Sequence, residues 1–132
     1  AGDQDRHREA AVTTILEHIG QARAAGDLSP LLAAIPYAQF MGMSVALVDG
    51  VLVTTMAYSP HIIGNPALPA LHGGTLGALL ESAAAFSLLW ASDTVVLPKT
   101  ITLTIDFLRP ATWRRWTANA RARLNRRRSA VA

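Results

Sequence analysis

Residues 73–90 read GGTLGALLESAAAFSLLW, a stretch of 18 residues that carries a single charge, at Glu81. Gly73-Gly74 are typical of a helix start and Ser92-Asp93 of a helix end, so we expect a helix from residue 73 to about residue 91. A helix that is apolar all round is enclosed either by its own protein or by a membrane. The mid-span carboxylate would cost about 2.5–3.5 kcal/mol on insertion into a bilayer. The stretch therefore predicts a buried central helix, and we disfavour a membrane span.

Segments typical of strands lie on both sides of this helix. Upstream, Met43–Val48 and residues 51–58 are separated only by Asp49-Gly50, the dipeptide that two-residue hairpin turns prefer. Downstream, residues 100–107 alternate polar and apolar side chains over eight positions, and residues 116–124 alternate again with an arginine-bearing outer face. We expect these four segments to form antiparallel strands.

Helices and a loop are predicted for the rest of the chain. Residues 5–24 have apolar side chains at helical spacing, and Ser29 is expected to cap a short second helix with Pro30 at its first position and Pro36 at its end. Residues 59–71 contain three prolines and predict a long loop. Residues 126–132 resemble the start of a fifth strand, so we expect the C-terminal strand to be incomplete.

This order of elements predicts an α+β fold, with an antiparallel sheet wrapped around the long central helix. Residues 1–34 would form an N-terminal helical extension, and residues 35–132 would form the sheet-and-helix domain. A sheet of four or five strands leaves exposed edges, which pairing with a second copy would cover.

Composition narrows the function classes. The chain has 132 residues, 51% hydrophobic and 16% charged, which excludes disordered and fibrous proteins. With zero cysteines there is no disulfide, thiol nucleophile or cysteine-type zinc site, and a cytoplasmic location is expected. The N-terminal residues are polar, so no secretory signal is readable. Seven of the twelve cations are arginines between Arg114 and Arg128, a stripe suited to a phosphate-bearing partner.

Glu81 is the strongest candidate for chemistry, because no other ionisable residue lies between His72 and Asp93. It lies either on the one solvent-facing stripe of an ordinary helix, or in partly apolar surroundings that make it a general base or nucleophile. At the start of the same helix, the backbone N–H groups of Gly73-Gly74 are suited to binding an anion or a developing oxyanion. We prefer the catalytic interpretation.

Three motifs strengthen the catalytic interpretation: Asn65-Pro66, Leu71-His72-Gly73-Gly74 with an acid nine residues after the histidine, and TITLTIDFLRPA at residues 100–111. Together they resemble the hotdog-fold thioesterases and, within them, the phenylacetic-acid-pathway (PaaI-like) acyl-CoA thioesterase group. The resemblance covers residues 37–111 and continues more loosely to residue 125. It implies an acyl-CoA thioester hydrolase with a hotdog fold that needs no cofactor, since coenzyme A is part of the substrate.

The resemblance also assigns roles. Glu81 matches the catalytic carboxylate, and Gly73 would supply the N–H that polarises the thioester carbonyl. Asn65 would help to hold the carbonyl or the attacking water, and Thr100 would lie near the acid. His72 and Gly74 would lie beside the substrate, although for His72 we favour a structural role at the loop-to-helix junction. Arg126, Arg127 and Arg128 would meet the phosphates of coenzyme A.

Geometry adds an argument from the residues alone. Gly73 and Glu81 are eight residues apart, which is about 12 Å along a helix axis, so one helix can hardly place both on one carbonyl. We therefore expect a homodimer with shared active sites, in which Gly73 and Asn65 come from one chain and Glu81 and Thr100 from its mate. A dimer of such dimers is expected.

Other functions stay open as alternatives. A hotdog hydratase or dehydratase is the nearest one, because His61 lies in a loop upstream of the helical acid. A non-catalytic acyl-CoA-binding domain is the next. Trp113 and Trp116 beside the arginines are compatible with nucleic acid, which we disfavour. The four histidines show no metal-binding spacing, so no metal is expected.

Overall fold

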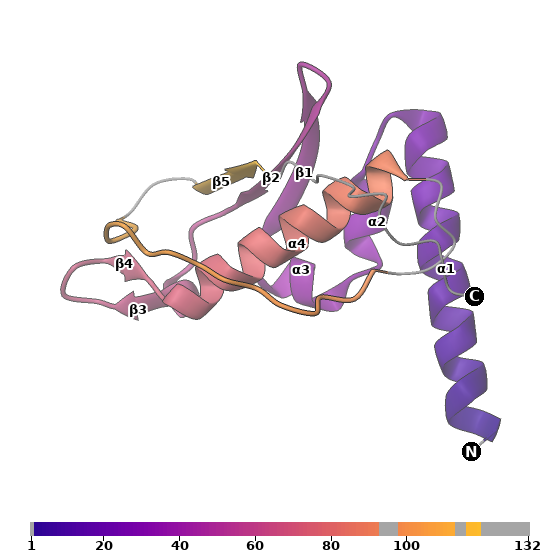
Figure 1. The fold of residues 1–132 in the computed structure, drawn as a ribbon, viewed down its shortest axis with the longest axis horizontal. Helices are drawn as coiled ribbons and strands as arrows, with labels where there is room; N and C mark the ends of the chain where they lie inside the picture. The colour runs from indigo at the N-terminus through magenta and orange to yellow at the C-terminus, as the bar shows by residue number, and fades with distance from the viewer. Residues whose placement is uncertain (1, 93–97, 113–115, 120–132) are drawn as a thin grey trace, which may run out of the picture.

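The computed structural model describes residues 2–92, 98–112 and 116–119. Its helices and strands form an α+β arrangement in which an antiparallel sheet lies against one long helix (Figure 1). The elements are α1 (Gly2–Ala25), α2 (Ser29–Ala33), α3 (Pro36–Phe40), β1 (Met43–Val48), β2 (Val51–Met56), η1 (Pro60–Ile62), β3 (Ile63–Asn65), β4 (Ala70–Leu71), α4 (Gly73–Ala91) and β5 (Trp116–Asn119).

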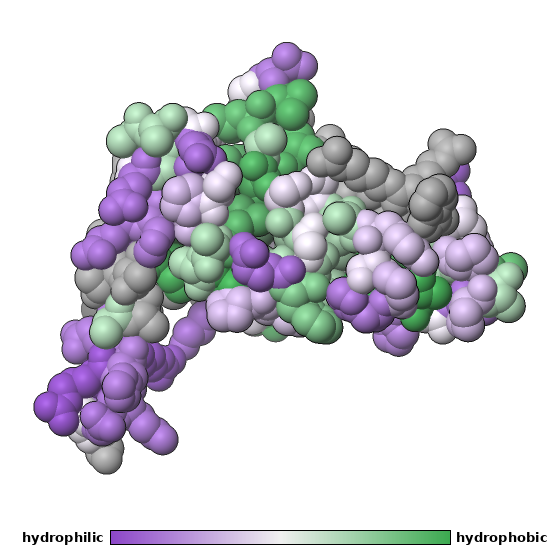
Figure 2. Space-filling model, turned by 180° about the vertical axis from the view of Figure 1, so that it is seen from behind, coloured by the Kyte–Doolittle hydropathy of each residue, from purple (hydrophilic) through white to green (hydrophobic). Residues whose placement is uncertain are grey.

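The β1–β2 hairpin forms as the sequence predicts. The two strands pair antiparallel from Met43↔Met56 to Val48↔Val51, and Asp49-Gly50 alone make the turn. Asp49 has φ 50° and Gly50 has φ 77°, the left-handed conformation that a type I′ turn requires at both positions. β5 pairs with the other edge of β2, which gives the order β1-β2-β5. Seen from behind, the hairpin carries a hydrophobic band on its surface (Figure 2), where Val48 and Val51 are exposed.

The predicted central helix is α4, which begins at Gly73 and ends at Ala91. It packs against β2 and contacts α1, so its apolar side chains supply much of the core. By length and composition α4 is also long and apolar enough to cross a membrane. The core holds one continuous set of buried apolar residues: Ile19, Ala22, Leu28, Leu31, Leu32, Ala38, Met41, Met43, Leu52, Met56, Ile62, Leu71, Leu79, Ala83, Phe86 and Leu89.

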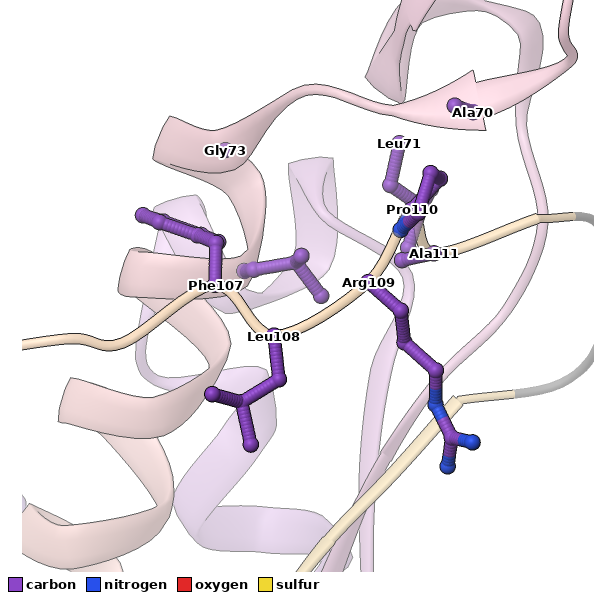
Figure 3. Close-up of a pocket in the computed structure, with 9 residues that line it drawn as sticks. Ala70, Leu71, Gly73, Phe107, Leu108, Arg109, Pro110 and Ala111 are labelled. Carbon is purple, nitrogen blue, oxygen red and sulfur yellow. The ribbon is translucent and has the colours of Figure 1, made fainter.

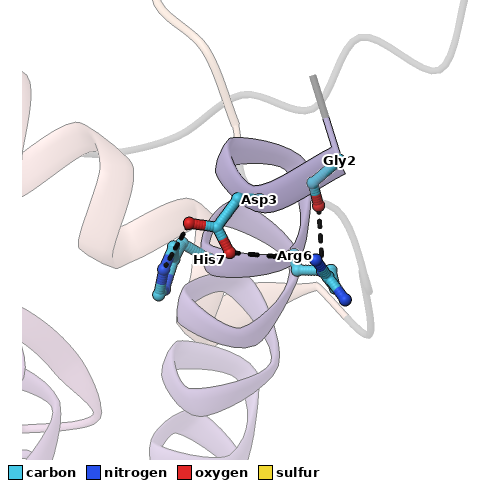
Figure 4. Close-up of polar contacts among 4 residues, drawn as sticks. All are labelled: Gly2, Asp3, Arg6 and His7. Atoms are coloured by element: carbon cyan, nitrogen blue, oxygen red, sulfur yellow. Dashed lines mark hydrogen bonds and ion pairs between the residues drawn. The ribbon is translucent and has the colours of Figure 1, made fainter.

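The N-terminal helices share this core. α1 buries Ile19 and Ala22, while its first turn is exposed and held by local ion pairs of Asp3 with Arg6 (3.9 Å) and with His7 (3.6 Å) (Figure 4). Such exposed pairs contribute little to stability. Near its other end, the Arg23 guanidinium donates to the carbonyls of Leu89, Trp90 and Ser92 and so ties α1 to the C-terminus of α4.

The expectation that Ser29 caps the second helix is wrong. Leu28 occupies the cap position of α2 and no side chain caps it. Instead, Oδ1 of Asp27 accepts from the Ser29 N–H at 2.9 Å, and hydrogen bonding to the backbone and side chain of Ser29 lowers the pKa of Asp27. Pro36, expected to end this helix, begins the separate α3, because proline suits a first helical position.

Residues 59–71, expected to be a loop, contain η1 and a small β3–β4 hairpin. The register is Ile63↔Leu71 and Asn65↔Ala70, and the His72 N–H donates to the Ile62 carbonyl at 3.0 Å. Gly64 allows this close approach, because a Cβ there would lie 2.7 Å from the Cα of His72. The prolines do not prevent pairing, since each lies outside the paired positions.

Residues 100–107 do not form the predicted strand. They run as an extended coil alongside α4, drawn in orange in Figure 1, without a strand partner in the described part of the chain. Alternation predicts an extended backbone with two faces, but a strand also needs a neighbouring edge to bond with. Pairing occurs only beyond this segment, where the Ala111 carbonyl accepts from the Leu71 N–H at 2.9 Å and Thr112 forms a bridge with Ala70.

The last predicted strands are described only in part. β5 covers Trp116–Asn119 of the strand predicted at 116–124. The predicted fifth strand at 126–132 and all seven arginines of the stripe lie outside the described residues.

Candidate functional site

A pocket of about 450 Å³ opens at the N-terminal end of α4 (Figure 3). One wall comes from β4 and the first turns of α4, through Ala70, Leu71, Gly73 and Leu76; the other wall is the coil at residues 107–111. The two walls are more than thirty residues apart in the sequence. The lining is apolar except for Arg109, so the pocket is suited to an apolar group that carries or adjoins a negative charge.

The α4 N-terminus has one open backbone donor within the described residues, and it belongs to Gly73, which lines this pocket. His72 is the cap residue, and its Nδ1 accepts from the Gly74 N–H at 2.9 Å, while the His72 carbonyl accepts from Thr75 and Leu76. These bonds confirm the structural role favoured for His72 and occupy the Gly74 donor. Within the described residues, the Gly73 N–H has no acceptor. This N–H lies at the positive end of the helix dipole, where it can bind a carbonyl oxygen as negative charge develops on it.

Phe107 covers the same helix start. A Cβ placed on Gly73 would lie 3.3 Å from the tip of the Phe107 ring, and one on Gly77 would lie 3.2 Å from a methyl of Ile105. The segment therefore runs antiparallel to α4, and two extended residues (about 7 Å) match four helical residues (about 6 Å). Glycine at both positions lets the coil approach the helix closely.

Glu81 is exposed, as in the solvent-facing alternative, which corrects the preferred expectation of partly apolar surroundings. The helix turns its larger apolar residues, such as Leu79 and Phe86, toward the core and leaves Glu81 on the opposite face. Since α4 is continuous from Gly73, the two residues are about 12 Å apart along its axis. A single described chain thus presents the acid and the open N–H at separate places.

The two other predicted catalytic helpers lie on elements other than α4: Asn65 ends β3, and Thr100 is in the coil that follows the helix. Asn65 is opposite Ala70 in the β3–β4 hairpin, and Ala70 lies three residues before Gly73. Its Oδ1 accepts from the Ala67 N–H at 3.0 Å, which leaves its amide N–H groups as donors. Thr100 is exposed and lies just before a bend at the start of the coil that runs beside α4.

His61 is engaged in local structure. Its Nε2 is 3.0 Å from the carbonyl of Phe40 and its Nδ1 is 2.6 Å from Oγ of Ser59, and its ring packs on the Phe40 ring at 4.6 Å. Both ring nitrogens therefore have protein partners. This arrangement gives no support to a hydratase in which His61 acts on a substrate.

The residues predicted to bind phosphate all lie outside the part of the chain that the structure describes. Arg126, Arg127 and Arg128 are not among the described residues. Among the described residues, no group of three or more histidine, aspartate or glutamate side chains could hold a metal ion.

The structure adds Phe107 and Arg109 to the residues that the sequence singled out. The sequence contained a signal for them, because Phe107 ends the apolar face of the alternating segment and Arg109 interrupts an otherwise uncharged Phe-Leu-x-Pro-Ala stretch. What the sequence alone did not reveal is that these residues face the start of α4.

One family comparison matches this region. Residues 68–132 match the thioesterase superfamily, and the matched stretch includes β4, all of α4 and the coil that closes the pocket. Neither the comparison with curated proteins nor the comparison with solved structures gives a match.

Proposed function

We propose that this protein hydrolyses acyl-CoA thioesters to the free acid and coenzyme A, as an enzyme of the phenylacetic-acid-pathway type with a hotdog fold. The observation that carries the proposal is the open Gly73 N–H at the wall of an apolar pocket, within the stretch that matches the thioesterase superfamily. Residues 35–132 would be the catalytic unit, with residues 1–34 an extension that packs on it. The proposed location is the cytoplasm.

The chemistry requires a donor for the carbonyl oxygen and a base for water. The Gly73 N–H would hydrogen-bond the thioester carbonyl and stabilise the oxyanion of the tetrahedral intermediate. The Glu81 carboxylate would take a proton from the attacking water and return it to the departing thiolate, which releases acid and thiol. Alternatively Glu81 would attack the carbonyl itself, and water would hydrolyse the resulting mixed anhydride.

The separation of the two residues makes the proposed enzyme a two-fold dimer. Gly73 and Asn65 of one chain would meet Glu81 and Thr100 of its mate, so each dimer would hold two shared sites. Support comes from the coil beside α4, which leaves Ile101 97% and Leu108 92% exposed, and from the exposed position of Glu81. A second copy would bury these apolar side chains and partly desolvate the acid. Two such dimers would pair as a tetramer.

The test is a panel of short-chain, medium-chain and aromatic acyl-CoA thioesters, with released thiol detected by a chromogenic reagent. The proposal expects turnover by the parent protein and none above background by Glu81→Gln. Mass spectrometry of the products separates hydrolysis from hydration, since only hydrolysis splits the thioester. Binding of coenzyme A without thiol release by any substrate would instead indicate a non-catalytic binding domain.

A further inference from the structure

We propose that Arg109 is the anion-binding residue of the pocket and holds a negatively charged group of the thioester substrate while the carbonyl lies at Gly73. This inference rests on the proposed function, and it makes Arg109 the residue that recognises the negative charge of the substrate. Arg109 is the single charged residue among those lining the pocket. It is exposed, and no ion pair or hydrogen bond engages its side chain within the described part of the chain.

The position of Arg109 is set by the coil that forms the outer wall. Phe107 packs over Gly73, and Arg109 follows two residues later, at a bend in the coil. Ala111 is anchored to Leu71 by a backbone hydrogen bond of 2.9 Å, which fixes the other end of the same wall. Arg109 is therefore held between two attachment points.

Figure 3 shows the consequence for the side chain. Phe107 points toward Gly73, whereas the Arg109 side chain extends away from it, and its guanidinium lies beyond the apolar wall. A ligand whose carbonyl binds at Gly73 would run past Leu108 and Leu76 before it reaches the guanidinium. The pocket thus selects a molecule with three parts in order: a polarised carbonyl, an apolar stretch and an anionic group.

The chemistry of guanidinium favours an oxyanion at that end. Arginine binds phosphate or carboxylate oxygens through two parallel hydrogen bonds, and it stays charged at any physiological pH. A phosphate on the thiol side of the substrate and a carboxylate at the far end of an acyl chain both satisfy this requirement. The experiment therefore compares substrates that carry one, the other or neither.

The variants are Arg109→Gln and, as a matched loss of charge, Arg8→Gln. Arg8 is exposed on α1, a helix that contributes no residue to the pocket lining. Three substrates are used: an acyl-CoA, the same acyl group on N-acetylcysteamine, which lacks phosphate, and an ω-carboxyacyl N-acetylcysteamine thioester. We expect Arg109→Gln to raise KM by about tenfold for one charged substrate, with kcat nearly unchanged, and to leave the uncharged thioester unaffected.

If KM rises only for acyl-CoA, the group that Arg109 binds is a phosphate. If KM rises only for the ω-carboxyacyl substrate, that group is the carboxylate. Equal KM values for parent and Arg109→Gln on every substrate, or an equal effect from Arg8→Gln, would overturn the inference. Calorimetric titration with coenzyme A and with the ω-carboxyacyl thioester distinguishes a failure of this inference from a failure of the proposed function. If the parent shows no hydrolysis but loses affinity for either ligand in Arg109→Gln, the function fails and the anion site stands; if neither affinity changes, both fail.

Discussion

At the scale of single residues, Gly73 combines two properties that one substitution series can separate. Its N–H has no acceptor within the described residues, and its missing side chain makes room for Phe107 at the pocket wall. Proline removes the N–H and alanine keeps it. Both add a Cβ, which would lie 3.3 Å from the exposed ring of Phe107 and require that ring to give way slightly.

We expect Gly73→Pro to lose roughly 10²–10³ in kcat, the effect of removing one oxyanion donor, and Gly73→Ala to keep most of its activity. Proline is compatible with the backbone here, because it would occupy the first position of α4 and because His72, at φ −65° and ψ 134°, has the extended conformation that must precede proline. Thiol release and circular dichroism give the comparison. Equal losses in the two variants would mean that the site needs the space and not the donor.

Glu81 gives the complementary prediction, because it is exposed and the described chain gives it no structural task. Glu81→Gln should change the free energy of unfolding by no more than about 0.5 kcal/mol, as for most surface substitutions. It should nevertheless lower turnover by roughly 10²–10⁴, the usual contribution of a general base. Turnover within about threefold of the parent would remove Glu81 from the mechanism.

At the scale of elements, Arg23 joins the first helix to the end of the central one. Its guanidinium donates to the carbonyls of Leu89, Trp90 and Ser92, which lie at the C-terminus of α4, where helical carbonyls lack partners and the dipole favours a cation. Arg23→Met keeps the apolar stem but removes these bonds. We expect it to lower the free energy of unfolding by about 1–3 kcal/mol.

Urea unfolding at one protein concentration measures this change, and Arg8→Met is the control, since Arg8 is exposed on the same helix. The control should stay within about 0.5 kcal/mol of the parent. A similar small change for Arg23→Met would show that water replaces the guanidinium at the α4 carbonyls.

The elements that the sequence predicts well are those with local signals. Asp49-Gly50 determines its turn through two positive φ angles, and α4 follows from one uninterrupted apolar stretch with a recognisable start. The strand at 100–107 was wrong because alternation specifies two faces of an extended chain but not a hydrogen-bonding neighbour. The β3–β4 hairpin was missed because the three prolines suggested a loop, and only the packing of Gly64 on His72 reveals the pairing.

In the candidate site, too, features with local sequence signals are predictable, and those that depend on contacts between distant segments are not. His72 as a helix cap and Gly73 as an open donor follow from neighbouring residues, so the sequence predicts them. The pocket depends on residues 107–111 meeting residues 70–76, a contact between distant segments. The sequence offered the exposed position of Glu81 only as the less favoured alternative, because a helix rich in alanine has no strongly polar stripe to show which face is outside. Orientation is set by the larger side chains, Leu79, Phe86 and Leu89, which pack into the core.

At the scale of the whole molecule, the proposed reaction depends on where two copies meet. Gly73 and Glu81 are about 12 Å apart on one rigid helix, so a site that uses both takes them from different chains. Two inactive variants test this: Glu81→Gln lacks the acid, and Gly73→Pro lacks the donor. In a mixed dimer with shared sites, one site carries both defects and the other carries neither.

Unfolding and refolding the two variants together should restore about a quarter of the parental activity, because random pairing makes half the dimers mixed and each mixed dimer has one intact site of two. Each variant refolded alone supplies the background, and two different affinity tags verify that mixed dimers have formed. Dilution should abolish the recovered activity when the dimers separate, since neither chain alone contains both groups. If tagged mixed dimers form and activity stays at background, each site is built within one chain, and either Gly73 or Glu81 has a role other than the one proposed.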